Sequence, residues 1–410
     1  MDQLSQPEKQ VANMKIIKTV ILGCLSVLIS ATCAQAQVDI FLDFNADWVT
    51  NLNESTNAAG VADFDATERL QIQTIIEDTF TTAFAPFLLN FSTTEPGGIR
   101  ERVNFGANTD GGGFGSAPLD FRNRFQNLTQ NVFAANFGGF IESNEPRSQQ
   151  IQEIATSLAG TGVHELGHSL GLRHHAAYGT PGITPSNYNN TQGLQNAHYL
   201  ATGSTGLNEI ERESTRTFST WSNVLLEAAL GVTANPLELQ TESGDAGDGI
   251  AGAQVLNQTF LDISGQTAGL VNGNLDAITD VDVYAFEATA AGTITAELWS
   301  DDLFTGGTQF DSVLRLLDSD GLTLGFSDDV LYNGDTFAGI TTRESDSFLL
   351  NIALPSAGTY FLEVSSFSNL ELGEYELIFG HNAIAAVPEP SGIVLLGIAS
   401  ALTLIRRKRA

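Results

Sequence analysis

Three histidines and one glutamate lie close together in the sequence, with the types and spacing of a catalytic metal centre. The run HELGHSLGLRH extends from His164 to His174. His164 and His168 are four residues apart, so on a helix both imidazoles lie on one face and can bind the same ion. Glu165 lies beside them, is not needed as a ligand, and can act as a general base. The pattern predicts a zinc site made of His164, His168 and His174.

Gly171 separates the first two histidines from the third. Glycine adopts the left-handed conformation that ends a helix and turns the chain back, so His174 is expected to approach the ion from the other side. Three protein ligands leave the fourth tetrahedral position open, as in catalytic rather than structural zinc sites. The chain has only 6 histidines, and an ordinary helical core does not select three of them at these offsets. A site that binds zinc but has lost catalysis stays open as an alternative.

Length and composition indicate two ordinary domains with additional tails. A chain of 410 residues with 42% hydrophobic residues is long and apolar enough to form real cores. The formal net charge of −30 argues against nucleic acid and against anionic membrane surfaces as partners.

Residues 1–36 have the order of a secretory signal peptide. Lys15 and Lys18 precede an apolar run at 19–31, and Ala34-Gln35-Ala36 follows as a cleavage site. The apolar run is shorter than the ~20 residues that span a membrane, which disfavours an anchor. Both cysteines of the chain lie in this segment, so the exported body is expected to contain no disulfide.

Residues 382–410 have a second targeting pattern. The motif Val387-Pro388-Glu389-Pro390 precedes an apolar stretch at 391–405 and a basic end, Arg406-Arg407-Lys408-Arg409. This order resembles the PEP-CTERM sorting signal of Gram-negative bacteria. The resemblance implies a short transmembrane segment, transient inner-membrane anchoring, and cleavage by an exosortase-type enzyme, which leaves the protein at the cell surface or outside the cell. A simple tail anchor is the alternative.

Residues 37–235 mix strand and helix patterns. Alternation from Val38 predicts a strand, and Asp65 begins a capping box and a helix that extends to about Phe84. Further strands are expected at 88–92 and 131–140, and the glycines at 111–115 predict a flexible loop.

A helix is expected to begin near Ser148 and to lead into the histidine motif. Gly160 and Gly162 each cost such a helix about 1 kcal/mol relative to alanine, so packing must override propensity. The resulting order of elements is α+β.

The extended signature HExxHxxGxxH is filled at every fixed position, and in this the chain resembles the metzincin clan of zinc metallopeptidases. The resemblance covers about 38–231. It implies His164, His168 and His174 as zinc ligands, Glu165 as the general base, and a cleft between an upper sheet domain and a smaller lower domain.

One departure from that clan concerns the methionine that lies in a turn beneath the zinc. This chain has no methionine after Met14, and Leu200 stands in the corresponding place. Leucine is apolar and similar in volume to methionine, so the packing beneath the zinc is expected to be retained, with some loss of activity or stability.

The other polar residues around the motif are expected to be structural. His175, Tyr178, His198 and Tyr199 are more often packing or loop residues than groups that act on a transition state. Arg173 is expected to be solvated rather than to clamp a substrate.

The C-terminal part differs in composition and in hydrophobic pattern. Residues 236–250 are polar and glycine-rich, which predicts a linker. Residues 251–381 contain short alternating runs between turn residues, which predicts an antiparallel β-sandwich. Strands are expected at 281–286, 312–317, 348–354, 360–364 and 375–379.

This region resembles the bacterial pre-peptidase C-terminal domain, an accessory sandwich found beside secreted peptidases. The matching runs are DVDVYAFEA, FDSVLRLLDSDG, AGTYFLEVSS and GEYELIF. Asp280, Asp282, Asp328 and Asp329 offer oxygen ligands for Ca²⁺. A solvated acidic face is an equally acceptable interpretation.

We therefore expect an α+β metzincin-like catalytic domain followed by an all-β sandwich domain, exported from a Gram-negative bacterium. The expected function is a Zn²⁺-dependent endopeptidase with Glu165 as general base and a protein or peptide substrate. The main alternative is a surface or extracellular-matrix binding protein with a vestigial zinc site, and a weaker one is a zinc hydrolase of non-peptide substrates.

Overall fold

A computed structural model gives the structure of the protein. It describes residues 38–87, 89–98, 100–108, 113–125, 127–177, 198–200, 216–231, 236–300, 310–328, 346–367 and 371–383, and the backbone at 336–337 and 340–341. The expected signal peptide, the apolar stretch at 391–405 and Tyr178 lie outside these residues. Within the described part of the chain, none of the helices combines the length and apolarity that crossing a membrane requires.

The N-terminal half contains a mostly parallel sheet. Its strands are β1 (Val38–Asp43), β2 (Leu89–Ser92), β3 (Glu101–Asn104), β4 (Gly115–Ser116) and β5 (Thr129–Val132). Their order is β2-β1-β3-β5-β4. The pairs β1–β2, β1–β3 and β3–β5 are parallel, whereas β4 pairs antiparallel with β5. β4 is therefore an edge strand that runs against its neighbour.

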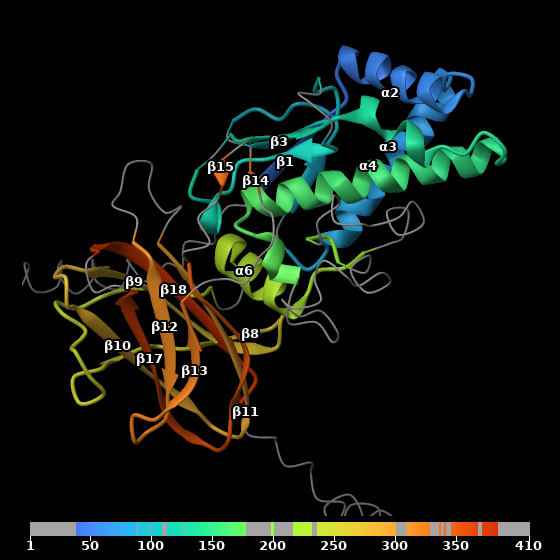
Figure 1. Ribbon diagram of the computed structural model, residues 1–410. Helices are drawn as coiled ribbons and strands as arrows, with labels where there is room; N and C mark the ends of the chain where they lie inside the picture. Colours follow the sequence, from blue (N-terminus) through green and yellow to red (C-terminus); the bar gives the residue numbers. More distant parts are fainter. Residues whose placement is uncertain are drawn as a thin grey trace, which may run out of the picture. The chain divides into compact units, whose positions relative to one another are not determined.

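Helices pack on this sheet and on one another (Figure 1). The α-helices are α2 (Ala46–Ala59), α3 (Ala66–Ala83), α4 (Arg147–Ser169) and α6 (Thr220–Leu230), and the 3-10 helices are η1 (Phe121–Asn123), η2 (Ala134–Phe140) and η3 (His174–Ala177). The predicted capping box is confirmed, because Asp65 accepts from the Glu68 amide and Glu68 accepts from the Asp65 amide. A Cβ added at Gly162 of α4 would lie 2.7 Å from Phe80 of α3. Close helix packing thus offsets the cost of this glycine, as expected.

Two expectations for this half are wrong. The strand expected at 131–140 ends at Val132, and η2 follows it. Ser55 of α2 fixes this turn, because its hydroxyl donates to the Ala134 carbonyl and accepts from the Phe137 amide. Gly115, expected in a flexible loop, belongs to β4. Helix α2 was not predicted, since its polar sequence has little apolar periodicity.

The C-terminal half contains two larger sheets and a small one. The strands are β6 (Leu239–Thr241), β7 (Gln254–Val255), β8 (Thr259–Leu261), β9 (Gln266–Leu275), β10 (Val281–Ala288), β11 (Gly292–Trp299), β12 (Ser312–Leu317), β13 (Thr323–Ser327), β14 (Thr336–Phe337), β15 (Ile340–Thr341), β16 (Phe348–Leu354), β17 (Gly358–Ser366) and β18 (Gly373–His381). One sheet has the order β13-β12-β17-β10-β7, and the other has the order β16-β11-β18-β9-β6, with β8 beside β9. β14 pairs with β15.

The two larger sheets share one apolar core, as in a sandwich. Phe286 of β10 and Phe379 of β18 come from different sheets, and their ring centroids are 4.9 Å apart. All five predicted strands are present, and those at 312–317 and 348–354 have the expected bounds. The predicted linker at 236–250 includes β6, which pairs in parallel with β9. Part of that segment therefore belongs to the sandwich.

Candidate metal centre

The end of α4 and the turn after it place the three histidines. His164 and His168 occupy the last turns of α4, which ends at Ser169. Gly171 follows with a φ of 91°, in the region that favours glycine. A Cβ at this position would also lie 3.1 Å from the Phe121 Cα atom. The turn therefore needs glycine for both conformation and space, and it leads directly to His174 at the start of η3.

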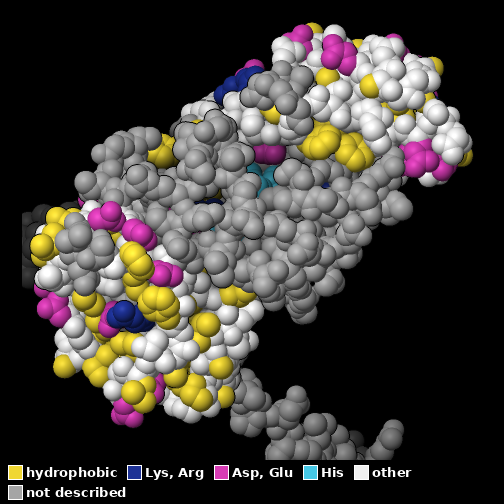
Figure 2. All heavy atoms as spheres, in the orientation of Figure 1, with side chains coloured by type: hydrophobic (Ala, Val, Ile, Leu, Met, Phe, Trp, Pro, Cys, Tyr) yellow, Lys and Arg dark blue, Asp and Glu magenta, His cyan; other side chains and the backbone are white. Residues whose placement is uncertain are grey.

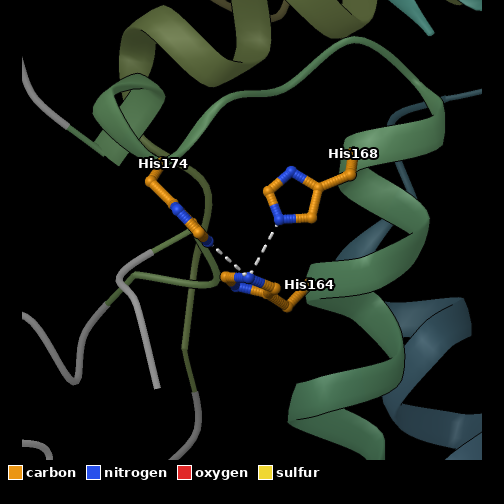
Figure 3. A group of neighbouring side chains, drawn as sticks. All are labelled: His164, His168 and His174. Carbon is orange, nitrogen blue, oxygen red and sulfur yellow. Dashed lines mark hydrogen bonds between the residues drawn. The ribbon is translucent and has the colours of Figure 1, made fainter. Parts of the chain in front are cut away.

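The three imidazoles converge on one point (Figure 3). The His164 Nε2 atom lies 3.0 Å from His174 Nε2 and 3.1 Å from His168 Nε2. Three nitrogens at zinc-ligand distance from a common ion, with tetrahedral angles, are about 3.3 Å apart. The ligand atoms are therefore close to the spacing that zinc requires, and the expected ligands lie together as predicted.

The outer nitrogens of two rings are held by backbone carbonyls. His164 Nδ1 lies 2.6 Å from the Tyr199 carbonyl oxygen, and His168 Nδ1 lies 2.7 Å from that of Leu172. Because a carbonyl can only accept, each Nδ1 must carry the proton, and each Nε2 presents a lone pair to the centre. Burial and the neighbouring His168 and His174 hold the pKa of His164 well below its usual range. The neutral form that binds a metal is thus favoured.

Glu165 lies against the edge strand of the sheet. Its side chain is only 7% exposed. A Cβ added at Gly115 of β4 would lie 2.5 Å from the Glu165 Oε1 atom and 2.7 Å from its Cγ atom. A larger residue at this position would have to displace the Glu165 side chain or the Asn131 backbone, whose carbonyl oxygen would lie 2.8 Å from the added Cβ. Histidine and acidic side chains are visible next to one another at the surface in the space-filling view (Figure 2).

Leu200 lies beneath the helix turn that carries the histidines. Its side chain is 1% exposed. A Cβ added at Gly167 would lie 3.3 Å from the Leu200 Cδ2 atom and 3.4 Å from Leu172 Cδ1. Leucine therefore packs against α4 at Gly167, between the first two histidines in the sequence.

The neighbouring residues that the structure describes are buried or half-buried, and one of them differs from expectation. His175 is buried, and its Nε2 atom lies 2.9 Å from Glu297 Oε1. His198 and Tyr199 are also buried, and burial lowers the pKa of His198 and raises that of Tyr199. Arg173 is not solvated as expected, because it donates to Asp346 and its guanidinium lies over Trp299.

Three contributions to the centre could not be predicted from the sequence. Tyr199 and Leu172 act through their backbone carbonyls, and Gly115 acts through the absence of a side chain. None of these roles leaves a signal in residue type or spacing.

A group of carboxylates lies in the sandwich. Asp280 has oxygens within 4.8 Å of those of Asp245 and Asp248. Among the described residues, Asp328 does not join this group, and Asp329 lies outside them. Asp282 is fully buried, and its Oδ1 atom has no hydrogen-bond partner in the described part of the chain. Burial, together with Glu242 and Asp280, raises the pKa of Asp282 to about 8.

Comparison with known proteins identifies one region of the chain. Residues 280–366 match the model of the bacterial pre-peptidase C-terminal domain family. The C-terminal half is therefore a β-rich domain compatible with the sandwich of that family, which confirms the predicted resemblance for this region. A search of curated proteins gives no match. The metzincin and PEP-CTERM resemblances stay predictions.

Solved structures give only weak likenesses. The pre-peptidase C-terminal domain of a collagenase from Bacillus anthracis is 18% identical over 35% of this chain and 96% of that chain, with a TM-score of 0.20. The VP2 subviral particle of infectious bursal disease virus is 14% identical over 27% of this chain and 29% of that chain, with a TM-score of 0.16. A family GH115 4-O-methyl-α-glucuronidase with specificity for decorated arabinogalactans is 9% identical over 57% of this chain and 29% of that chain, with a TM-score of 0.16. The family match is thus the informative comparison.

Proposed function

We propose that this protein is an exported zinc-dependent endopeptidase. The observation that supports this most directly is the convergence of the three Nε2 atoms beside the buried Glu165. The match of residues 280–366 to the pre-peptidase C-terminal domain adds support, because that domain is typical of secreted peptidases.

The residues divide the chemistry between them. His164, His168 and His174 would hold the ion through Nε2. A bound zinc ion polarises a carbonyl group and lowers the pKa of a water molecule, which makes peptide hydrolysis possible near neutral pH. Glu165 would accept the proton of the attacking water and return it to the amine that leaves.

The edge strand β4 offers a binding place for the substrate. An edge strand has unpaired backbone N–H and C=O groups that can pair with an extended peptide. β4 is the end strand of its sheet, and its backbone lies against Glu165. A peptide added along β4 would therefore place its backbone close to the general base, which favours a peptide over a non-peptide substrate.

A substitution of Glu165 tests this function. Glu165→Gln is expected to bind zinc like the intact protein and to lose chelator-sensitive cleavage of casein or gelatin, because the amide cannot accept the proton. Glu153→Gln, in a buried position on the same helix, serves as the control and is expected to keep its activity. Retention of cleavage by Glu165→Gln would refute the mechanism.

The alternatives predict different outcomes. A surface or matrix binding protein with a vestigial site would bind zinc but give no chelator-sensitive cleavage. A hydrolase of non-peptide substrates would cleave ester or amide substrates in preference to peptides.

We also propose a calcium site in the sandwich, formed by Asp245, Asp248 and Asp280. Oxygen ligands from several carboxylates suit Ca²⁺. A second indication is the raised pKa of the buried Asp282, because Glu242 and Asp280 concentrate negative charge beside it and a cation there would offset that repulsion. Calorimetric titration with Ca²⁺ tests this site.

Export and processing are part of the same proposal. Removal of residues 1–36 and cleavage near Val387 by an exosortase-type enzyme would give a mature protein without either tail. The mass of the protein recovered from the cell surface or the medium tests both cleavages.

A further inference from the structure

We propose that the β-sandwich is part of the metal centre, because Glu297 and Asp346 position the segment that carries His174. This inference rests on the proposed zinc site. It assigns the sandwich a role in metal binding, in addition to the accessory role that its family implies.

The third ligand needs support that the first two do not. His164 and His168 are fixed by the long helix α4. His174 begins η3, which is only four residues long, and so short a helix has little stability of its own. Contacts from outside must therefore determine where His174 lies.

His175, the residue after His174, is anchored by buried hydrogen bonds around Glu297. The His175 Nε2 atom lies 2.9 Å from Glu297 Oε1, and the Trp221 Nε1 atom donates to Glu297 Oε2 at 2.8 Å. Glu297 belongs to β11 of the sandwich and is fully buried. Although burial acts to raise its pKa, the interactions with His175, Arg173 and Trp221 lower the pKa of Glu297 below its usual range. The carboxylate therefore stays ionised and holds both donors.

On the other side of His174, a stacked arginine anchors the preceding residue. The Arg173 Nη2 atom donates to Asp346 Oδ2 at 2.6 Å, and its guanidinium lies 3.7 Å from the centre of the Trp299 ring. The Phe121 ring stacks on Trp299 at 4.1 Å. Asp346 is held in turn by Ser300, whose amide and hydroxyl donate to Oδ1.

These two anchors flank a single ligand. Arg173 and His175 are the residues on either side of His174, and both are bonded to carboxylates of the sandwich. The Ser222 hydroxyl also donates to the Ala176 carbonyl, so α6 holds the far end of η3. Groups that orient a metal ligand commonly change metal affinity by about 10- to 100-fold when they are removed. Loss of either anchor is therefore expected to weaken zinc binding.

The test measures the zinc dissociation constant of the full chain by competition with a chelator. His175→Ala removes the donor to Glu297 and is expected to weaken zinc binding about tenfold. His175→Gln keeps an amide donor near the same place and is expected to restore most of the affinity. Glu363→Gln breaks the Arg315–Glu363 ion pair elsewhere in the sandwich and is expected to leave zinc affinity unchanged.

A second variant and a second readout separate positioning from stability. Asp346→Asn keeps the Oδ1 atom that accepts from Ser300 and removes the oxygen that accepts from Arg173. If His175→Ala fails to fold, this variant gives the same test. The absorption spectrum of the Co²⁺-loaded protein reports whether the ligand geometry has changed.

Equal zinc affinity and an unchanged Co²⁺ spectrum in His175→Ala and Asp346→Asn would overturn the inference, even if both variants melt at a lower temperature. Failure of the intact protein to bind zinc would instead refute the proposed function.

Discussion

At the scale of single residues, the centre depends on atoms that residue type alone does not reveal. That His164, His168 and His174 lie together could be predicted, because metal binding by a helix fixes both residue type and spacing. The backbone carbonyls of Tyr199 and Leu172 orient two of the rings. Any residue can supply a carbonyl oxygen, so the sequence contains no sign of these contacts.

Gly115 provides a prediction at this scale. Gly115→Ala is expected to lower kcat/KM for a peptide substrate at least tenfold, because the added methyl group would lie 2.5 Å from Glu165 Oε1 and displace the carboxylate. Zinc affinity should change little, since Glu165 is not a ligand. Gly113→Ala is the matched control, as its Cβ would meet only the Gly115 carbonyl oxygen at 3.6 Å. Equal activity in the two variants would contradict this account of Glu165.

At the scale of elements, sequence patterns succeed where local interactions decide the structure. The capping box at Asp65 and the alternation of β12 and β16 determine those elements with little help from the rest of the chain. Residues 134–140 have a strand-like composition, but Ser55 on α2 binds their backbone and turns it into η2. Such contacts lie far apart in the sequence, so periodicity cannot predict them.

Leu200 gives a prediction about the packing beneath α4. Leu200→Ala is expected to lower the free energy of unfolding by about 2–5 kcal/mol, because it leaves a cavity in a fully buried place. Leu200→Met conserves volume and should cost less than about 1.5 kcal/mol. Urea unfolding of the zinc-free protein measures both values. A Leu200→Ala variant as stable as Leu200→Met would show that Gly167 and Leu200 are not in close contact.

Asp282 gives a prediction about pH. Its pKa is about 8 in the folded protein and near 3.9 when unfolded, so the folded state binds the proton more tightly. The stability that this proton contributes is complete below pH 4 and is lost as the pH rises towards 8. Without calcium, Asp282→Asn should therefore gain stability relative to the intact protein between pH 5 and 8, by at most about 1.4 kcal/mol per pH unit.

Thermal or urea unfolding at several pH values measures this difference. Saturating Ca²⁺ should reduce it, because the ion stabilises the ionised carboxylate of the intact protein. Parallel pH profiles for the two proteins would show that Asp282 ionises normally.

At the scale of the whole molecule, the two halves share buried apolar surface. Trp299, Phe348 and Ile378 of the sandwich belong to the same buried cluster as Phe121 and Trp221 of the N-terminal half. The sequence predicted two domains joined by a linker, because composition changes near residue 236. The shared core could not be predicted from the sequence, because the hydrophobic pattern of each half is that of an independent domain.

A truncation tests the dependence of one half on the other. A chain that ends at residue 235 is expected to lack cooperative unfolding or to aggregate, because part of its apolar cluster would be exposed to water. The full chain should unfold in a single transition of the N-terminal half and the sandwich together. Circular dichroism and calorimetry distinguish these outcomes. A stable, soluble fragment with a sharp transition would contradict the shared core.

The separation in sequence between His175 and Glu297, 122 residues, has a consequence for the order of events during biosynthesis. A chain that is made and exported from its N-terminus presents the first two ligands long before the residues that hold the third. The complete metal centre would then form only after most of the sandwich has also crossed the membrane. Any proteolytic activity would then begin only after the sandwich has been made and folded.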